Sequence, residues 1–215
     1  MPVHDLGYRK WFGKRNHQLI RPLFVARSGI TLIWRRRMLK LLLMVAWLPI
    51  AIPAIGIFCF EQGVTDVTYR NVIIRTLQGP MERPDLATQM LQDPVSVRHE
   101  VWSTLILGFF RVPQLYSMVL LIGLIAPLLI SYDLRSKAYL QYFSRPLSPN
   151  EYIVGKSAVI WFFLGMITTL PGLALYLLGI LLSPEISVVG MTWDIPLRIL
   201  LASVALIVPT TALAL

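Results

Sequence analysis

Long apolar runs alternate with short charged segments along this chain of 215 residues. Four runs reach the length of about 20 residues that crosses a hydrocarbon core of about 30 Å, and they cover 41–60, 112–131, 153–182 and 195–215. The second helix is expected to begin earlier, near Val95. Because no run shows the alternation typical of barrel strands, we predict an all-α fold, a polytopic bundle of four transmembrane helices.

Composition and charge agree with a membrane protein. Hydrophobic residues make up 56% of the chain and charged residues only 14%, against about 25% in soluble domains. Net charge alternates from +9 in residues 1–40 to −2 in 61–100, +2 in 131–156 and −2 in 183–194. Since basic segments stay in the cytoplasm, we predict a cytoplasmic N-terminus, an external loop at 61–100 and a cytosolic segment at 131–152. The isoelectric point of about 10.1 then reflects membrane topology and not nucleic-acid binding.

The basic arm, residues 1–40, precedes the predicted transmembrane domain, residues 41–215. Apolar residues recur in the arm at helical spacing: Leu19, Leu23, Ala26, Ile30 and Ile33. This pattern favours an amphipathic helix in the membrane plane over a frayed start of the first span. A bend is expected at Gly29 or at the triplet Arg35, Arg36 and Arg37, which is interpreted as an anchor at the anionic leaflet.

Two further arginines lie near the ends of apolar runs. Arg111 precedes Ser131 by about 30 Å of helix, at about 1.5 Å per residue, which predicts a position at the outer interface. Arg198 follows Asp194 by four residues, a spacing that favours an ion pair on a helix. Both arginines are interpreted as interface anchors and not as parts of a substrate site.

Small residues recur every seven positions in the third run, at Ala158, Gly165, Gly172 and Gly179. They share almost one helix face, and small side chains let helices approach closely in lipid. We predict that this face packs against neighbouring helices. Prolines predict kinks at Pro171, and also at Pro49, Pro53 and Pro127.

The segment between the second and third runs, SYDLRSKAYLQYFSRPLSPNEYIVGKS at residues 131–157, mixes charges with aromatic residues. Ser148 and Glu151 have the spacing of a capping box, with Pro149 at the first helical position, so the third helix is predicted to start at 149. Upstream, residues 132–143 contain no Gly or Pro and can form a short cytosolic helix that ends before Pro146. A partner or the membrane interface must cover the apolar side chains that this helix would expose. These are Tyr139, Leu140, Tyr142 and Phe143.

Residues 124–156, LIAPLLISYDLRSKAYLQYFSRPLSPNEYIVGK, resemble the permease subunits of bacterial type 2 ATP-binding-cassette transporters. In that family an acidic residue and an arginine, a Ser-Arg-Pro turn, a tyrosine and a Gly-Lys pair join the second and third spans. The matching positions are Asp133, Arg135, Leu140, Ser144, Arg145, Pro146, Tyr152, Gly155 and Lys156. Residues 3–15, VHDLGYRKWFGKR, also resemble the N-terminal start of one bacterial branch.

The resemblance implies a permease subunit, expected to be an exporter in the bacterial inner membrane. A separate ATPase, which binds ATP and Mg²⁺, would dock on residues 132–147, the coupling segment, and a second permease copy or homologue would complete a dimer. The expected docking residues are Asp133, Arg135, Tyr139, Leu140, Tyr142, Phe143, Ser144, Arg145 and Pro146. Family members usually have six spans, whereas the fourth run is still open at Leu215. Either the sequence is a fragment or the last two helices come from elsewhere, and we expect a fragment.

Other functions are weighed against this one. A membrane anchor or assembly protein without transport also fits the aromatic segment. A secondary transporter is less expected, because it would show ionisable groups near the midplane and internal repeats, and neither is visible in the sequence. NEYIVGKS at 150–157 mimics a phosphate-binding loop but has Asn150 where that loop needs glycine. We therefore expect no ATPase or other enzyme activity, and no cofactor, in this chain. His4, His17 and His99 are interpreted as isolated, and the single cysteine, Cys59, as helix packing.

Overall fold

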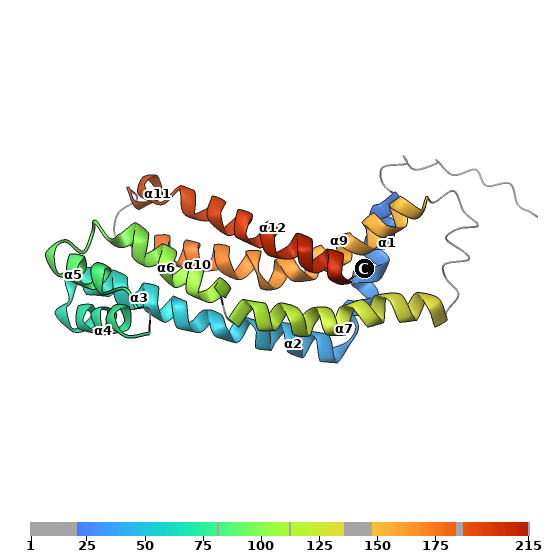
Figure 1. Cartoon of the computed structure of the whole chain (residues 1–215), viewed down its shortest axis with the longest axis horizontal. Helices are drawn as coiled ribbons and strands as arrows, with labels where there is room; N and C mark the ends of the chain where they lie inside the picture. Colours follow the sequence, from blue (N-terminus) through green and yellow to red (C-terminus); the bar gives the residue numbers. More distant parts are fainter. Residues whose placement is uncertain (1–20, 81, 112, 136–147, 184–186, 215) are drawn as a thin grey trace, which may run out of the picture.

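The computed structural model describes residues 21–80, 82–111, 113–135, 148–183 and 187–214. Among these residues there is no strand, so the predicted all-α fold is confirmed (Figure 1). The elements in chain order are α1 (Arg21–Trp34), α2 (Arg37–Trp47), the 3₁₀ turn η2 (Leu48–Ile50), α3 (Ala51–Thr65), α4 (Val67–Gln78), α5 (Pro84–Gln92), α6 (Arg98–Arg111), α7 (Pro113–Arg135), α9 (Pro149–Ile167), α10 (Thr169–Leu182), α11 (Val188–Met191) and α12 (Asp194–Ala214).

Four helical stretches are long and apolar enough to cross a membrane, as predicted. They are Arg37–Val64, Arg98–Leu128, Pro149–Leu182 and Asp194–Ala214. The second stretch begins at Arg98, close to the early start expected near Val95. All four run along the long axis of the molecule (Figure 1). We call its two ends the α1 end and the α4 end, after the helices that lie there.

Two clusters of buried side chains hold the bundle together. The cluster in the half toward the α4 end contains Trp102 and Leu175, and the cluster in the half toward the α1 end contains Leu121 and Phe163. Around them the surface is largely apolar, and Leu181, for example, is 82% exposed. Such a surface is stable only when lipid or another protein covers it.

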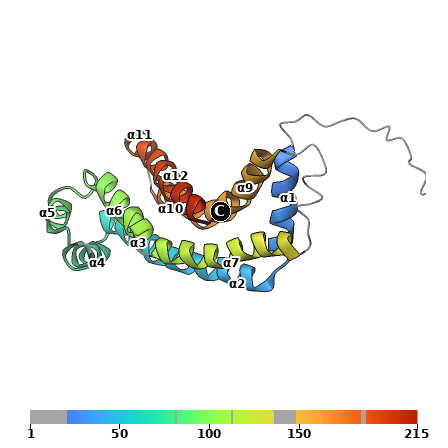
Figure 2. The same ribbon diagram turned by 45° about the vertical axis from the view of Figure 1, so that its right-hand side comes forward.

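The first and third spans are interrupted at one level of the bundle, which we call the break level. The interruptions lie at η2 in the first span and at Thr168 in the third, and in the second span Pro113, which has no backbone N–H, lies at the same level. Two hydrogen bonds show that they lie side by side. Trp47 Nε1 donates to the Met166 carbonyl at 3.1 Å, and Gln114 Nε2 donates to the Ile167 carbonyl. Figure 2 shows the spans changing direction here.

Proline explains the break in the third span. Pro171 has no N–H, so the carbonyl of Ile167, four residues earlier, has no donor within its own helix. Gln114, which is fully buried on α7, supplies that donor from another span. Its own Oε1 atom has no hydrogen-bond partner among the described residues. The kinks expected at Pro49 and Pro171 thus coincide with breaks.

The predicted external loop at 61–100 contains two helices, α4 and α5, that sequence analysis missed. Asp66 caps α4, because its Oδ1 accepts a hydrogen bond from the Thr68 backbone N–H at 2.7 Å. Leu77 of α4 and Met90 of α5 are buried in the cluster that also holds Trp102. Both helices form a cap at the end of the bundle opposite α1 (Figure 1).

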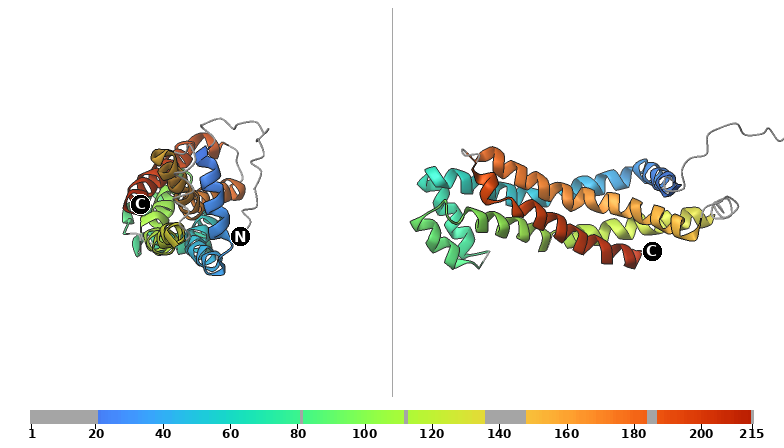
Figure 3. Two further views of the ribbon diagram at one scale, coloured as in Figure 1. Left: turned by 90° about the vertical axis from the view of Figure 1, so that its right-hand side faces the viewer. Right: turned by 90° about the horizontal axis from the view of Figure 1, so that it is seen from above.

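Helix α1 lies across the long axis of the bundle. In the end-on view of Figure 3 it is seen from the side while the spans point toward the viewer, and Figure 2 shows the same orientation. Gly29 lies within α1, and the chain turns at Arg35–Arg36 before α2 begins, so the expected bend falls at the basic triplet. The crosswise orientation fits an in-plane helix, whose contact with a membrane stays a prediction.

Candidate functional site

The candidate functional site is the α1 end of the bundle, where the coupling segment joins α7 to α9. Helix α7 continues to Arg135, and α9 begins at Pro149. The prediction of a separate helix starting at Tyr132 is therefore wrong for residues 132–135, which form the last turn of α7. The side chains of Asp133 and Arg135 lie outside the described residues, and so do Tyr139, Leu140, Tyr142, Phe143, Ser144, Arg145 and Pro146.

The predicted capping box at the start of α9 is confirmed. Ser148 Oγ accepts a hydrogen bond from the Glu151 backbone N–H at 3.3 Å, and Glu151 Oε2 accepts one from the Ser148 backbone N–H at 2.8 Å. These bonds pair two backbone N–H groups that would otherwise lack an acceptor at the start of the helix. They fix the point at which the chain leaves the coupling segment and enters the third span.

Helix α1 packs closely on the first turns of α9. A Cβ atom at Gly155 would lie 2.7 Å from Val25 Cβ and 3.0 Å from the Pro22 carbonyl oxygen of α1, so only glycine fits there. The next residue, Lys156, is buried, and its Nζ atom lies 5.4 Å from the centre of the Tyr152 ring. Three positions that match the permease motif thus lie on α9 at its joint with α1, next to the coupling segment. They are Tyr152, Gly155 and Lys156.

The basic triplet is exposed at the same end of the bundle. Arg35, Arg36 and Arg37 occupy the turn between α1 and the start of α2. Guanidinium groups in this place can reach lipid phosphates or water without crossing an apolar region. Their role as membrane anchors stays a prediction, because the structure contains no lipid.

A buried ion pair that the sequence pattern did not predict lies near the α4 end. Arg98 Nε and Nη2 donate to the two carboxylate oxygens of Glu61 at 3.1 and 3.2 Å, and Trp102 Nε1 donates to the same carboxylate at 3.1 Å. The Glu61 side chain is 0% exposed and the Arg98 side chain 5% exposed. A signal was available, since Glu61 directly follows the first apolar run and must find a partner there.

A second charged group joins α6 to α12. The predicted pair is confirmed, because Arg198 Nε lies 2.8 Å from Asp194 Oδ2. The other carboxylate oxygen lies 2.8 Å from His99 Nε2, so the interpretation of His99 as an isolated residue is wrong. Sequence spacing cannot show a contact between residues of different spans.

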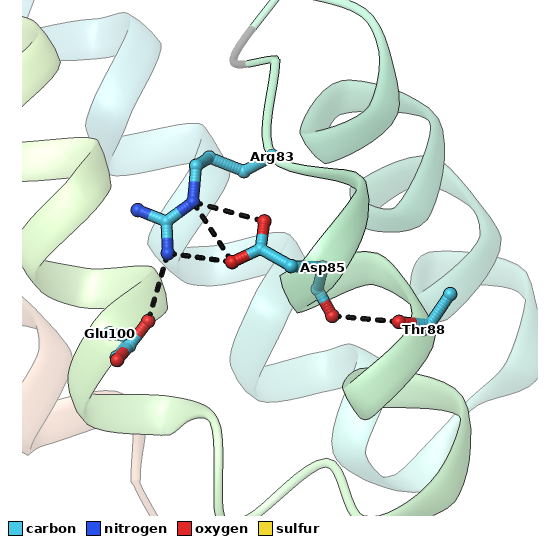
Figure 4. A network of polar contacts seen from close by, with 4 residues as sticks. All are labelled: Arg83, Asp85, Thr88 and Glu100. Atoms are coloured by element: carbon cyan, nitrogen blue, oxygen red, sulfur yellow. Dashed lines mark hydrogen bonds and ion pairs between the residues drawn. The ribbon is translucent and has the colours of Figure 1, made fainter.

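The start of α5 is tied to α6 by exposed charges (Figure 4). Arg83 Nη2 lies 2.9 Å from Asp85 Oδ2 and 3.0 Å from Glu100 Oε2. The hydrogen bonds from Arg83 hold the pKa of Asp85 below its ordinary value. This network orients α5 over the end of α6, and because it is exposed it contributes little to stability.

Arg111 lies halfway along the bundle. It ends α6 at the break level, about 14 Å further along the helix than Trp102 at about 1.5 Å per residue. Its neighbour Phe110 faces Gly172, which lies about 15 Å from the end of α10 at Leu182. The second span continues past Arg111 for about 20 Å toward the α4 end, because α6 begins at Arg98. The role of Arg111 as an interface anchor stays a prediction.

The small-residue face is divided by the break at Thr168. On α10, Cβ atoms at Gly172 and Gly179 would lie 2.8 Å from Ile199 Cγ2 and 2.7 Å from Trp102 Cη2, so both glycines lie at close helix contacts. On α9, a Cβ atom at Gly165 would meet only Thr169 Oγ1, at 4.0 Å, among the described residues. Ala158 is partly buried beside the second cluster. Among the described residues, the small-residue face thus makes close helix–helix contacts at Gly172 and Gly179, in the half toward the α4 end.

Within the described residues there is neither a phosphate-binding loop at 150–157 nor a cluster of metal ligands. Residues 150–157 form the first turns of α9, so the stretch that mimics a phosphate-binding loop is helical. No group of three or more His, Cys, Asp or Glu side chains lies close enough to hold a metal ion within the described residues. Cys59 is a free thiol. Compared with known proteins, the chain matches no family model, no curated protein and no solved structure.

Proposed function

We propose that this chain is the membrane-spanning permease subunit of an ATP-binding-cassette transporter. In this proposal a separate ATPase docks on residues 132–147 and binds the ATP and Mg²⁺, so that the chain itself carries no ATPase site. It works as an exporter in the bacterial plasma membrane, together with a second permease copy or homologue.

The observation that supports the proposal most is the construction of the α1 end. Two spans, α7 and α9, reach this end and are joined there by the segment that carries the Ser-Arg-Pro motif. Because α1 packs on α9 at Gly155, a displacement of the coupling segment acts on a rigid joint of two helices. Thiol labelling tests the orientation of the chain in the membrane, and pull-down tests the docking of the ATPase.

We expect the two ends of the bundle to lie on opposite sides of the membrane. In a chain without Cys59, Gln78→Cys places a thiol on the exposed end of α4, and Ser136→Cys places one in the coupling segment. An impermeant maleimide added to intact cells should label only the first variant, since basic segments stay inside. Labelling after permeabilisation is the control, and labelling of both thiols from one side would overturn the topology.

Docking of the ATPase is expected to depend on the aromatic residues of the coupling segment. Phe143→Ala or Tyr139→Ala should weaken its association by about 2 kcal/mol or more, roughly 30-fold, because buried aromatic anchors dominate interfaces. Pull-down of the ATPase and transport-stimulated hydrolysis in vesicles with the complete transporter measure this effect. Arg145→Ala should reduce coupling between hydrolysis and transport more than it reduces binding.

The matched control is Tyr116→Ala, which removes an aromatic side chain that is 72% exposed on α7 but distant from the coupling segment. It should leave ATPase association unchanged. If the coupling-segment variants insert normally and also bind the ATPase like the unmodified chain, the permease proposal fails. A membrane anchor or assembly protein then becomes the better explanation of the aromatic segment.

A further inference from the structure

We propose that Arg111 binds an anionic group, a phosphate or carboxylate, at the break level inside the membrane. The proposal goes beyond the function given above, which names no ligand. It rests on two observations, namely the depth of this guanidinium and the lack of a carboxylate partner for it among the described residues.

The depth of Arg111 is set by its neighbours on three spans. Gln114, one turn further along the same span, donates to the Ile167 carbonyl, and Trp47 donates to the Met166 carbonyl. The first span makes its 3₁₀ turn here, midway between the exposed Lys40 and the buried Glu61. Each side of this level spans about 15 Å of helix, which is half of a hydrocarbon core of about 30 Å. An arginine side chain is too short to leave such a region completely.

The described part of the chain offers no carboxylate to this guanidinium. Arg111 is exposed, and it has no ion pair or hydrogen bond with any described side chain. None of the 11 Asp and Glu residues lies within the four apolar runs. Glu61, which directly follows the first of these runs, is already bonded to Arg98 and Trp102.

Guanidinium groups pair with phosphates and carboxylates through two parallel hydrogen bonds. An anion with an apolar tail, or a small anion that enters through water, would compensate the charge of Arg111.

Thermal unfolding of the purified chain in neutral maltoside detergent tests the proposal. Dodecyl phosphate should raise the melting temperature of the unmodified chain, because a ligand that binds only the folded state stabilises it. Dodecyltrimethylammonium, with the same tail and the opposite charge, should not. Arg111→Leu should weaken dodecyl phosphate binding by about tenfold or more, and Arg111→Lys should weaken it less. The control Arg75→Leu removes an exposed charge of α4, outside the four spans, and should bind like the unmodified chain.

A parallel titration with inorganic phosphate distinguishes the two sources of the anion. Binding of dodecyl phosphate alone indicates a lipid-like ligand, and binding of both indicates a water-accessible site for a polar anion. Equal binding by the unmodified chain, Arg111→Leu and Arg111→Lys, or no binding by the unmodified chain, overturns the proposal. The binding test uses neither the ATPase nor transport. If dodecyl phosphate does not bind at Arg111, the permease proposal is unaffected. If the permease proposal fails, binding at Arg111 can still be measured.

Discussion

Glu61→Ala is expected to lower the free energy of unfolding by about 3–5 kcal/mol, the cost of breaking a buried ion pair from one side. The substitution leaves Arg98, whose side chain is only 5% exposed, without its carboxylate. It also removes the acceptor of the Trp102 indole N–H. Unfolding of the detergent-solubilised chain, followed by tryptophan fluorescence, measures the change.

The matched comparison is Arg83→Ala at the exposed ion pairs of α5. That change should cost less than about 1 kcal/mol, because water replaces the lost contacts. Glu61→Gln should fall between the two, since an amide oxygen still accepts from Trp102 but carries no charge. If Glu61→Ala and Arg83→Ala destabilise equally, the buried pair does not hold α3 to α6 in the folded protein.

Gly179→Ala and Gly108→Ala are expected to change stability in opposite directions. A Cβ atom at Gly179 would lie 2.7 to 2.9 Å from three ring atoms of Trp102, which is fully buried and bonded to Glu61. Overpacking of this kind costs about 1–3 kcal/mol. At Gly108 no atom lies within 4 Å of the added Cβ, so alanine should stabilise α6 by up to about 1 kcal/mol through helix propensity.

Thermal unfolding of both variants in one detergent tests the difference, and Gly179→Leu should extend the loss. A stabilising effect at Gly179 would mean that α10 and α6 can separate there without loss. The same reasoning applies to Gly172, whose Cβ would meet Ile199, a β-branched side chain with few alternative rotamers.

The elements that depend on local sequence could be predicted, and the contacts between elements could not. Apolar run length was sufficient for the four spans, and the Ser148–Glu151 spacing was sufficient for the start of the third. Arg198 and Asp194 could also be paired, because both lie on one helix. In each case the physical cause acts within about one turn of helix or along one uninterrupted run.

Other features could be identified only from the three-dimensional structure. The pairing of Glu61 with Arg98 joins two spans whose registry no local pattern specifies. The position of Arg111 along the bundle could not be read from the apolar run that follows it, because α6 continues the span back to Arg98. Helices α4 and α5 were missed because their apolar faces are short and mixed with charges, and they are stable only when packed on α3 and α6.

The Gln114–Ile167 bond makes the middle of the bundle mechanically different from its ends. A continuous helix resists bending because consecutive turns share their hydrogen bonds. At one height the first and third spans have given up part of that stiffness, and in the third a side chain from a different span supplies the missing donor. A bend of the third span is therefore expected to require less free energy at this height than within α9 or α10, where every turn keeps its backbone hydrogen bonds.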